Sequence, residues 1–139
     1  MDMTERNKTA RSHGRKGERQ ARAWLKKLAP NVQVYIINEL LDLLIGRTYI
    51  EVKTCADYIS SGDKYERRAG RYTIERDQHD LLTSTDGYYL FVVLHDIRPA
   101  TLFLCRARNQ SFHKQIAWTT ALRSQITPKE AANVISRDE

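Results

Sequence analysis

The chain has 139 residues, 41% of them hydrophobic, so it is long enough for one domain with a hydrophobic core and short for two. Its 23 Lys and Arg against 17 Asp and Glu give a formal net charge of +6, which favours a polyanionic partner. The longest apolar run, 88–94, has the length of a buried strand and not of a bilayer-spanning helix. No apolar stretch follows the basic opening residues, so we expect a soluble, cytoplasmic protein.

The first half of the chain contains one predicted helix and three predicted strands. Residues 1–13 are polar and basic without helical periodicity, which predicts a flexible arm ahead of a single domain at 14–139. From Gly17 the apolar spacing predicts a helix with one buried face, ended by Pro30. Three runs rich in β-branched and aromatic residues then predict strands at 32–37, 40–45 and 48–54.

The second half predicts a further helix, two strands and a short terminal helix. The polar segment 55–72 is expected as a long loop or a strand extension. A helix capped by Thr73 should end before Gly87. Strands follow at 88–94 and 101–106, and the Thr-Pro-Lys-Glu sequence at 127–130 predicts the start of a C-terminal helical extension. This order indicates an α/β fold with a mixed sheet and helices packed on it.

A predicted hairpin carries acidic residues where its neighbours favour burial. Gly46 and Arg47 fit a two-residue loop, because glycine at the first central position suits a type II′ turn. The resulting register pairs Ile45 with Thr48, Leu44 with Tyr49, Leu43 with Ile50 and Asp42 with Glu51. Two carboxylates about 5 Å apart at Cβ repel each other, and a divalent cation such as Mg²⁺ would compensate them. In another register both acids would be exposed edge residues.

Three more polar residues could converge on these acids. Lys53 shares a strand face with Glu51 and could orient a metal-activated water or support developing charge. Glu18 is spaced with Ala21 on the first helix, which predicts a place on the buried stripe and a further metal ligand. The alternative is a solvated first-turn acid. Gln78 shares a stripe with the leucines of the second helix and could hold the lysine, a water or a phosphate. Its neighbours His79 and Asp80 are expected as ordinary helix-surface residues.

This order of residues resembles the PD-(D/E)xK nuclease superfamily, and within it the small archaeal Holliday junction resolvase-like and restriction endonuclease-like members. The resemblance spans 14–104, and Leu41 stands where the family name has proline. It implies a restriction-endonuclease-like αβββαβ core with a mixed central sheet flanked by helices. It also implies that Mg²⁺, or Mn²⁺ in its place, is bound by Glu18, Asp42, Glu51 and the carbonyl of Val52. Lys53 would assist the attacking water, with Gln78 in support.

Two basic segments predict phosphate contacts with DNA, branched or duplex, unless they are only solvated surface. They comprise Arg11, Arg15, Lys16 and Arg19 near the first helix, and Lys64, Arg67, Arg68 and Arg71 after the third strand. Cutting both strands would need a homodimer, because one small domain presents one active site. The apolar residues Phe112, Ile116, Trp118 and Leu122 would form that interface or simply cover the sheet.

The predicted function is therefore a metal-dependent DNA endonuclease, with Holliday junction resolvase-like, structure-selective cutting in recombination or repair as the first choice. A sequence-specific restriction or homing-type endonuclease is the second choice. A non-catalytic nucleic-acid-binding module with the nuclease fold is the alternative from a different class. Cys55 and Cys105 lie far apart in strand-like surroundings and are expected as buried free thiols.

Overall fold

The centre of the protein is a five-stranded mixed sheet. The computed structural model describes residues 3–31, 33–36, 43–60 and 67–136. The strand order is β1-β2-β3-β7-β8, in which β3 and β7 run parallel and the other neighbours run antiparallel. These strands are β1 (Val34–Ile36), β2 (Leu43–Ile45), β3 (Thr48–Ala56), β7 (Tyr88–Leu94) and β8 (Thr101–Arg106). The predicted strands at 88–94 and 101–106 are thus confirmed.

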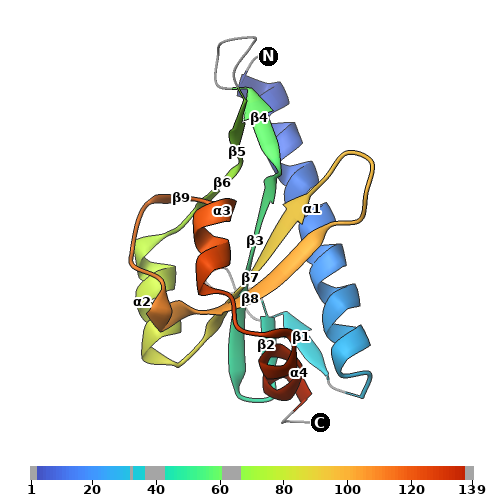
Figure 1. The fold of residues 1–139 in the computed structure, drawn as a ribbon, viewed down its shortest axis with the longest axis vertical. Coiled ribbons are helices and arrows are strands. Elements are labelled where there is room, and N and C mark those ends of the chain that lie inside the picture. The colour runs from blue at the N-terminus through green and yellow to red at the C-terminus, as the bar shows by residue number, and fades with distance from the viewer. Residues whose placement is uncertain (1–2, 32, 37–42, 61–66, 137–139) are drawn as a thin grey trace.

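Helices cover both faces of the sheet and make a three-layer α/β/α arrangement. The helices are α1 (Met3–Leu28), α2 (Arg76–Ser84), α3 (Trp118–Ala121) and α4 (Pro128–Ser136). In Figure 1, α1 runs along the right of the sheet while α2 and α3 lie on the left. Leu25 of α1 and Ile135 of α4 share one apolar core, and Leu82 of α2 and Ala121 of α3 share the other.

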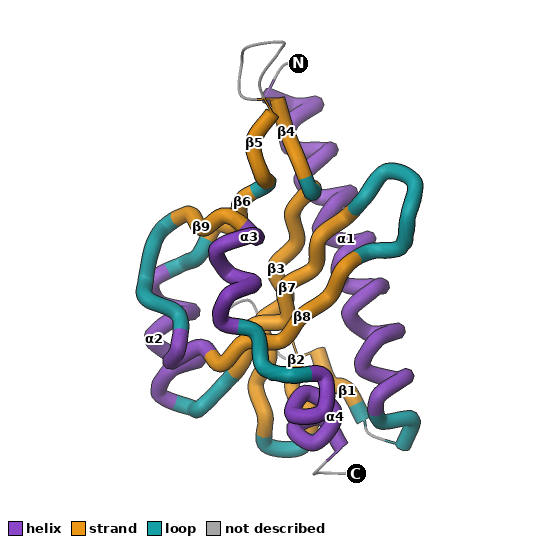
Figure 2. Tube along the Cα trace, viewed as in Figure 1, coloured by secondary structure: helices purple, strands orange, loops and turns teal. Residues whose placement is uncertain are grey.

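Between β3 and α2 the chain forms short strands where a loop or strand extension was expected. β4 (Tyr58–Ser60) pairs with β5 (Arg67–Ala69), and β6 (Arg71–Thr73) pairs with β9 (Gln115–Ala117). Single 3₁₀ turns occupy Ala107–Asn109 and Leu122–Ser124. Figure 2 shows β4 and β5 rising beyond the end of the central sheet. The core order is therefore αβββαβ, with β4, β5 and β6 inserted before α2 and β9 after β8.

The β2–β3 hairpin has the predicted register, with Leu43 opposite Ile50 and Ile45 opposite Thr48. Gly46 has a φ of 58°, and Arg47 is not among the described residues with positive φ. A positive φ at the first central residue alone is what a type II′ turn requires. The polar pair predicted next in this register includes Asp42, which lies outside the described residues.

Two predicted helix starts are wrong. α1 begins at Met3 instead of Gly17, so 3–13 continue the helix and are not an arm without regular structure. The reason is that this segment lacks proline and can propagate a helix whose later turns are packed on the sheet. Thr73 lies in β6, and α2 begins at Arg76 with Glu75 as its N-cap. Pairing of Thr73 with Gln115 outweighs its capping propensity.

The C-terminal apolar residues cover the sheet. Ile116 is buried, and Phe112, Trp118 and Leu122 pack against the same core as Phe91 and Phe103. The capping of α4 is as predicted, because the Glu130 amide donates to the Thr127 hydroxyl at 3.1 Å. Among the described residues, we found no helix with the length and apolar composition needed to cross a bilayer.

Candidate active site

A compact polar cluster joins the third strand of the sheet to α2. The Lys53 Nζ donates a hydrogen bond to Gln78 Oε1 at 3.0 Å and lies 3.9 Å from Glu51 Oε1. The side chain of Lys53 is 15% exposed and that of Glu51 is 5% exposed. Since little water reaches the pair, their electrostatic interaction is stronger than that of a surface ion pair. The structure therefore brings together three of the predicted site residues.

The alternation of β3 and the start of α2 place these side chains. Ile50 and Val52 face the core shared with α1, so Glu51 and Lys53 project from the opposite face, toward α2. β3 pairs with β7 from Ile50 to Ala56, which fixes Glu51 opposite Tyr89 and Lys53 opposite Phe91. Both neighbours are fully buried, so the charged pair lies beside two buried aromatic side chains of β7.

His79, expected as a helix-surface residue, is instead buried beside Tyr89, with 8% of its surface exposed. Its Nδ1 lies 2.8 Å from the hydroxyl of Tyr89, and the two rings stack with centroids 5.9 Å apart. Burial lowers the pKa of His79, which favours the neutral ring. Burial and the nearby Glu51 charge raise the pKa of Tyr89. The expectation failed because the periodicity of a nine-residue helix shows one stripe, while neighbouring β9 and Phe112 cover a second.

Glu18 is exposed and does not lie on the buried stripe of α1, so that part of its prediction is wrong. Gly17, one residue earlier, is the buried position, and a Cβ there would overlap Thr54 Oγ1. Helix α1 packs on the sheet face that carries Val52, opposite the face from which Glu51 and Lys53 project. The predicted role of Glu18 as a metal ligand stays a prediction.

The donor atoms at this cluster have the chemistry that a hard divalent cation prefers. Glu51 supplies a buried carboxylate next to the carbonyl of Val52, and oxygen ligands of this kind suit Mg²⁺. Among the residues that the structure describes, no three His, Cys, Asp or Glu side chains are grouped as a metal site. Asp42 lies outside those residues, so its part in a complete set of metal ligands stays a prediction.

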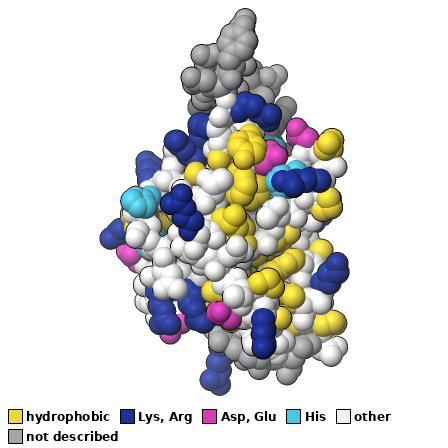
Figure 3. All heavy atoms as spheres, viewed as in Figure 1, with side chains coloured by type: hydrophobic (Ala, Val, Ile, Leu, Met, Phe, Trp, Pro, Cys, Tyr) yellow, Lys and Arg dark blue, Asp and Glu magenta, His cyan; other side chains and the backbone are white. Residues whose placement is uncertain are grey.

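The predicted DNA-contacting residues fall in two places. Arg67 and Arg71 are exposed on β5 and β6, and the Arg67 guanidinium lies 5.8 Å from the Tyr58 ring centroid. Arg68 is half-buried. The predicted contacts at Arg11 and Lys64 cannot be placed, since the Arg11 side chain and the whole of Lys64 lie outside what the structure describes. Arg15, Lys16 and Arg19 are exposed on α1. Figure 3 shows one face of the molecule, on which Lys and Arg side chains surround a central hydrophobic strip.

Sequence reasoning missed a second polar cluster, centred on Asp57. Its carboxylate accepts a hydrogen bond from the Tyr58 amide at 2.7 Å and lies 2.9 Å from the Nδ1 of His95. The hydrogen bond with His95 is the main reason that the pKa of Asp57 lies below its usual range. An acid at the end of one strand and a histidine at the end of its parallel neighbour would have been the only signal in the sequence.

A family model described as a PD-(D/E)XK nuclease superfamily domain matches residues 4–134. No curated protein and no solved structure gives a match. The family match spans nearly the whole chain, and the described strands and helices have the αβββαβ order of a restriction-endonuclease-like fold. The chain therefore belongs to the PD-(D/E)XK nuclease superfamily.

Proposed function

We propose that this nuclease is a metal-dependent endodeoxyribonuclease that prefers branched DNA, such as a four-way junction. The observation that supports it most is the cluster of Glu51, Lys53 and Gln78 in a chain of this superfamily. A buried carboxylate beside an ammonium group combines a metal ligand with a source of positive charge. Both are what hydrolysis of a phosphodiester requires, because negative charge develops on the phosphoryl oxygens.

The proposed metal site uses Asp42, Glu51 and the Val52 carbonyl, and Mg²⁺ or Mn²⁺ bound there would polarise a phosphoryl oxygen and acidify a water. Lys53 is proposed to orient the attacking water and to stabilise charge on the phosphate. Gln78 restricts the ammonium group through the 3.0 Å hydrogen bond, so the lysine is preorganised before the substrate binds.

The preference for branched DNA rests on how little of the chain remains for reading bases. Most of the described residues build the sheet and its covering helices, and the exposed arginines of β5 and β6 suit phosphate contacts. Paired cuts across a junction would require a homodimer, which we propose as the active form. Cleavage of a specific duplex sequence is the second candidate within the same class.

The experiment is a cleavage assay on four-way-junction, flap, single-stranded and plain duplex DNA, each with Mg²⁺, Mn²⁺ or EDTA. We expect metal-dependent cutting that is strongest on the junction. The variants Asp42→Asn and Glu51→Gln should lose cutting by at least about 100-fold, because a missing carboxylate weakens metal binding. Both should still bind DNA.

Glu130→Gln is the matched control, since Glu130 is an exposed acid on α4 and glutamine preserves its capping box. It should cleave like the wild type. Cutting that persists in EDTA or in Glu51→Gln would refute the proposed mechanism. DNA binding without cleavage of any substrate would favour the non-catalytic module, and equal cutting of all substrates would refute the preference for branched DNA.

A further inference from the structure

A basic cleft lies between α1 and the turn that joins β7 to β8, away from the Glu51–Lys53–Gln78 cluster. Its volume is about 510 Å³, and its polar lining includes His13, Lys16, Arg19, His95, Asp96 and Arg98. Ala56, at the end of β3, also lines it. The cleft thus joins the N-terminal half of α1 to the end of the strand that carries Glu51 and Lys53.

The charge in the cleft suits a phosphate chain. Lys16 and Arg19 stand three residues apart on α1, so they lie on one face of the helix, and Arg98 faces them from the turn. Against these three permanent cations the lining contains one carboxylate, that of Asp96. All three cationic side chains are exposed, so they are accessible to a ligand that enters from solvent.

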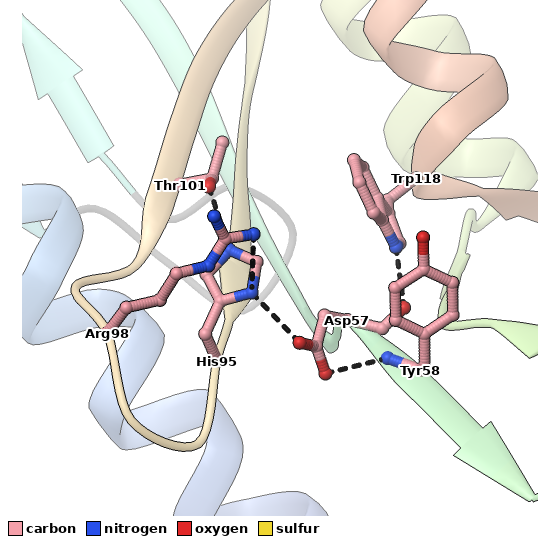
Figure 4. A network of polar contacts seen from close by, with 6 residues as sticks. All are labelled: Asp57, Tyr58, His95, Arg98, Thr101 and Trp118. Carbon is pink, nitrogen blue, oxygen red and sulfur yellow. Dashed lines mark hydrogen bonds and ion pairs between the residues drawn. The ribbon is translucent and has the colours of Figure 1, made fainter.

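The turn that carries Arg98 is fixed at its base by a buried histidine (Figure 4). The His95 side chain is 3% exposed, with Nδ1 2.9 Å from the Asp57 carboxylate and Nε2 2.8 Å from the Thr101 hydroxyl. A carboxylate only accepts hydrogen bonds, so Nδ1 donates to Asp57. The Arg98 guanidinium lies 3.4 Å from the same ring nitrogen. The histidine therefore ties both ends of the β7–β8 turn to the end of β3.

Asp57 is itself held by contacts from three other segments. Its amide donates to the Leu94 carbonyl at 3.0 Å. Its carbonyl accepts the Gly70 amide at 3.0 Å and the indole nitrogen of Trp118 at 2.7 Å. The base of the β7–β8 turn is therefore held to the end of β3 through a residue that is itself fixed by hydrogen bonds from several segments.

We propose that this cleft binds the phosphate backbone of a nucleic-acid strand and positions it relative to the active site, an inference that rests on the nucleic-acid substrate proposed above. Ala56 follows Lys53 by three residues, about 10 Å along β3, and because side chains alternate along a strand the two residues lie on opposite faces of the sheet. A nucleic-acid backbone that contacts both places therefore has to pass around the end of β3, where the cleft lies. Lys16, Arg19 and Arg98 contact the backbone, and the hydrogen bonds of His95 with Asp57 and Thr101 hold the turn that carries Arg98.

The test is equilibrium binding of a short fluorescent DNA duplex to the full chain in EDTA, from about 50 to about 200 mM salt. The variant Lys16→Gln/Arg98→Gln removes two cleft charges. Its control, Lys27→Gln/Arg123→Gln, removes two exposed charges elsewhere, and Lys27 lies about 16 Å further along α1 than Lys16. We expect the cleft variant to raise Kd roughly tenfold at low salt and to flatten the slope of log K against log salt by about 2.

Equal losses in the two double variants would overturn the proposal, as would a wild-type slope in the cleft variant or no binding by the wild type. Inorganic phosphate and a mononucleotide are added as competitors. If either displaces the duplex at concentrations near the duplex Kd, the cleft binds an isolated phosphate and the proposal fails. Because EDTA prevents metal-dependent hydrolysis, the result is independent of cleavage. A chain that binds through the cleft and never cuts would refute only the endonuclease.

Discussion

The Lys53 ammonium and the Gln78 amide, 25 residues apart in sequence, form a partly buried 3.0 Å hydrogen bond between β3 and α2. A flexible lysine side chain has many conformers, and this bond selects those in which Nζ stays near Glu51. Helix α2 thus acts on Lys53 through the side chain of Gln78, so a single substitution at Gln78 tests this contact.

The variant Gln78→Ala should reduce single-turnover cleavage about 10- to 100-fold and change substrate Kd little. The reason is that losing a hydrogen bond to a charged group costs about 1.5–3 kcal/mol, which here falls on the positioning of Lys53. Gln78→Glu, which keeps an acceptor for the ammonium, should recover part of the rate. Single-turnover rates at saturating enzyme measure both.

Gln115→Ala is the control for this prediction, because Gln115 is exposed on β9 and pairs through its backbone with Thr73. It should cleave at the wild-type rate. If Gln78→Ala instead weakened binding and left the single-turnover rate intact, Gln78 would contact the substrate and would not position the lysine.

Two glycines of α1 should respond in opposite ways to alanine. A Cβ at Gly17 would overlap the side chain of Thr54, whereas one at Gly14 would have no atom within 4 Å. Gly14→Ala should stabilise the fold by about 0.5–1 kcal/mol through helix propensity, and Gly17→Ala should destabilise it by about 1–3 kcal/mol. Urea unfolding followed by circular dichroism measures both. Equal stabilisation would show that α1 does not approach β3 this closely.

His79 should make stability depend on pH in the weakly acidic range. Burial lowers its folded pKa below 6.5, so the unfolded chain takes up the proton first as the pH falls. The free energy of unfolding is then unaffected by this group above about pH 6.5 and decreases as the pH falls from there to the folded pKa. Denaturant unfolding between about pH 7 and pH 5 should show the decrease.

The variant His79→Gln removes the titrating ring, so its stability should change less over this pH range, although it starts lower because the contact with Tyr89 is lost. His113→Gln, at an exposed position, should keep the wild-type pH dependence. A wild-type profile in His79→Gln would assign the acid sensitivity to another group.

The two cysteines should be nearly inert in the native protein. Burial raises the pKa of Cys55 to about 11 and that of Cys105 to about 12, so little thiolate exists at pH 8. A disulfide thiol reagent should therefore modify both thiols at the rate of unfolding and modify them rapidly in denaturant. Fast stoichiometric reaction of the native protein would contradict the burial that both residues show.

Local patterns predicted those parts of the fold and site that depend on neighbours in sequence. The register of β2 on β3 followed from a two-residue turn, and the contact of Lys53 with Gln78 followed from strand alternation and one helical stripe. Both patterns have a fixed period, so a residue number determines a direction. The buried free state of Cys55 was likewise predicted, from its apolar strand.

Tertiary contacts decided the rest. Helical spacing could not choose between Gly17 and Glu18, because adjacent positions differ by about 100° and the choice depends on how closely Thr54 approaches. His79 was misassigned since a second layer of chain covers its side of α2. The cleft around Arg98 depends on α1 meeting a turn that is remote in sequence, which no local period encodes.

The parallel pairing of β3 with β7 has a consequence for how the protein folds. The β2–β3 and β7–β8 pairs are antiparallel and local, whereas the pairing of Ile50 with Tyr88 joins segments on either side of α2. Contacts that close long loops lose more chain entropy before they gain energy, so we expect this pairing to form late. Since Glu51 and Lys53 lie on the strand that it fixes, the proposed nuclease site would assemble only when the slowest contact of the sheet is complete.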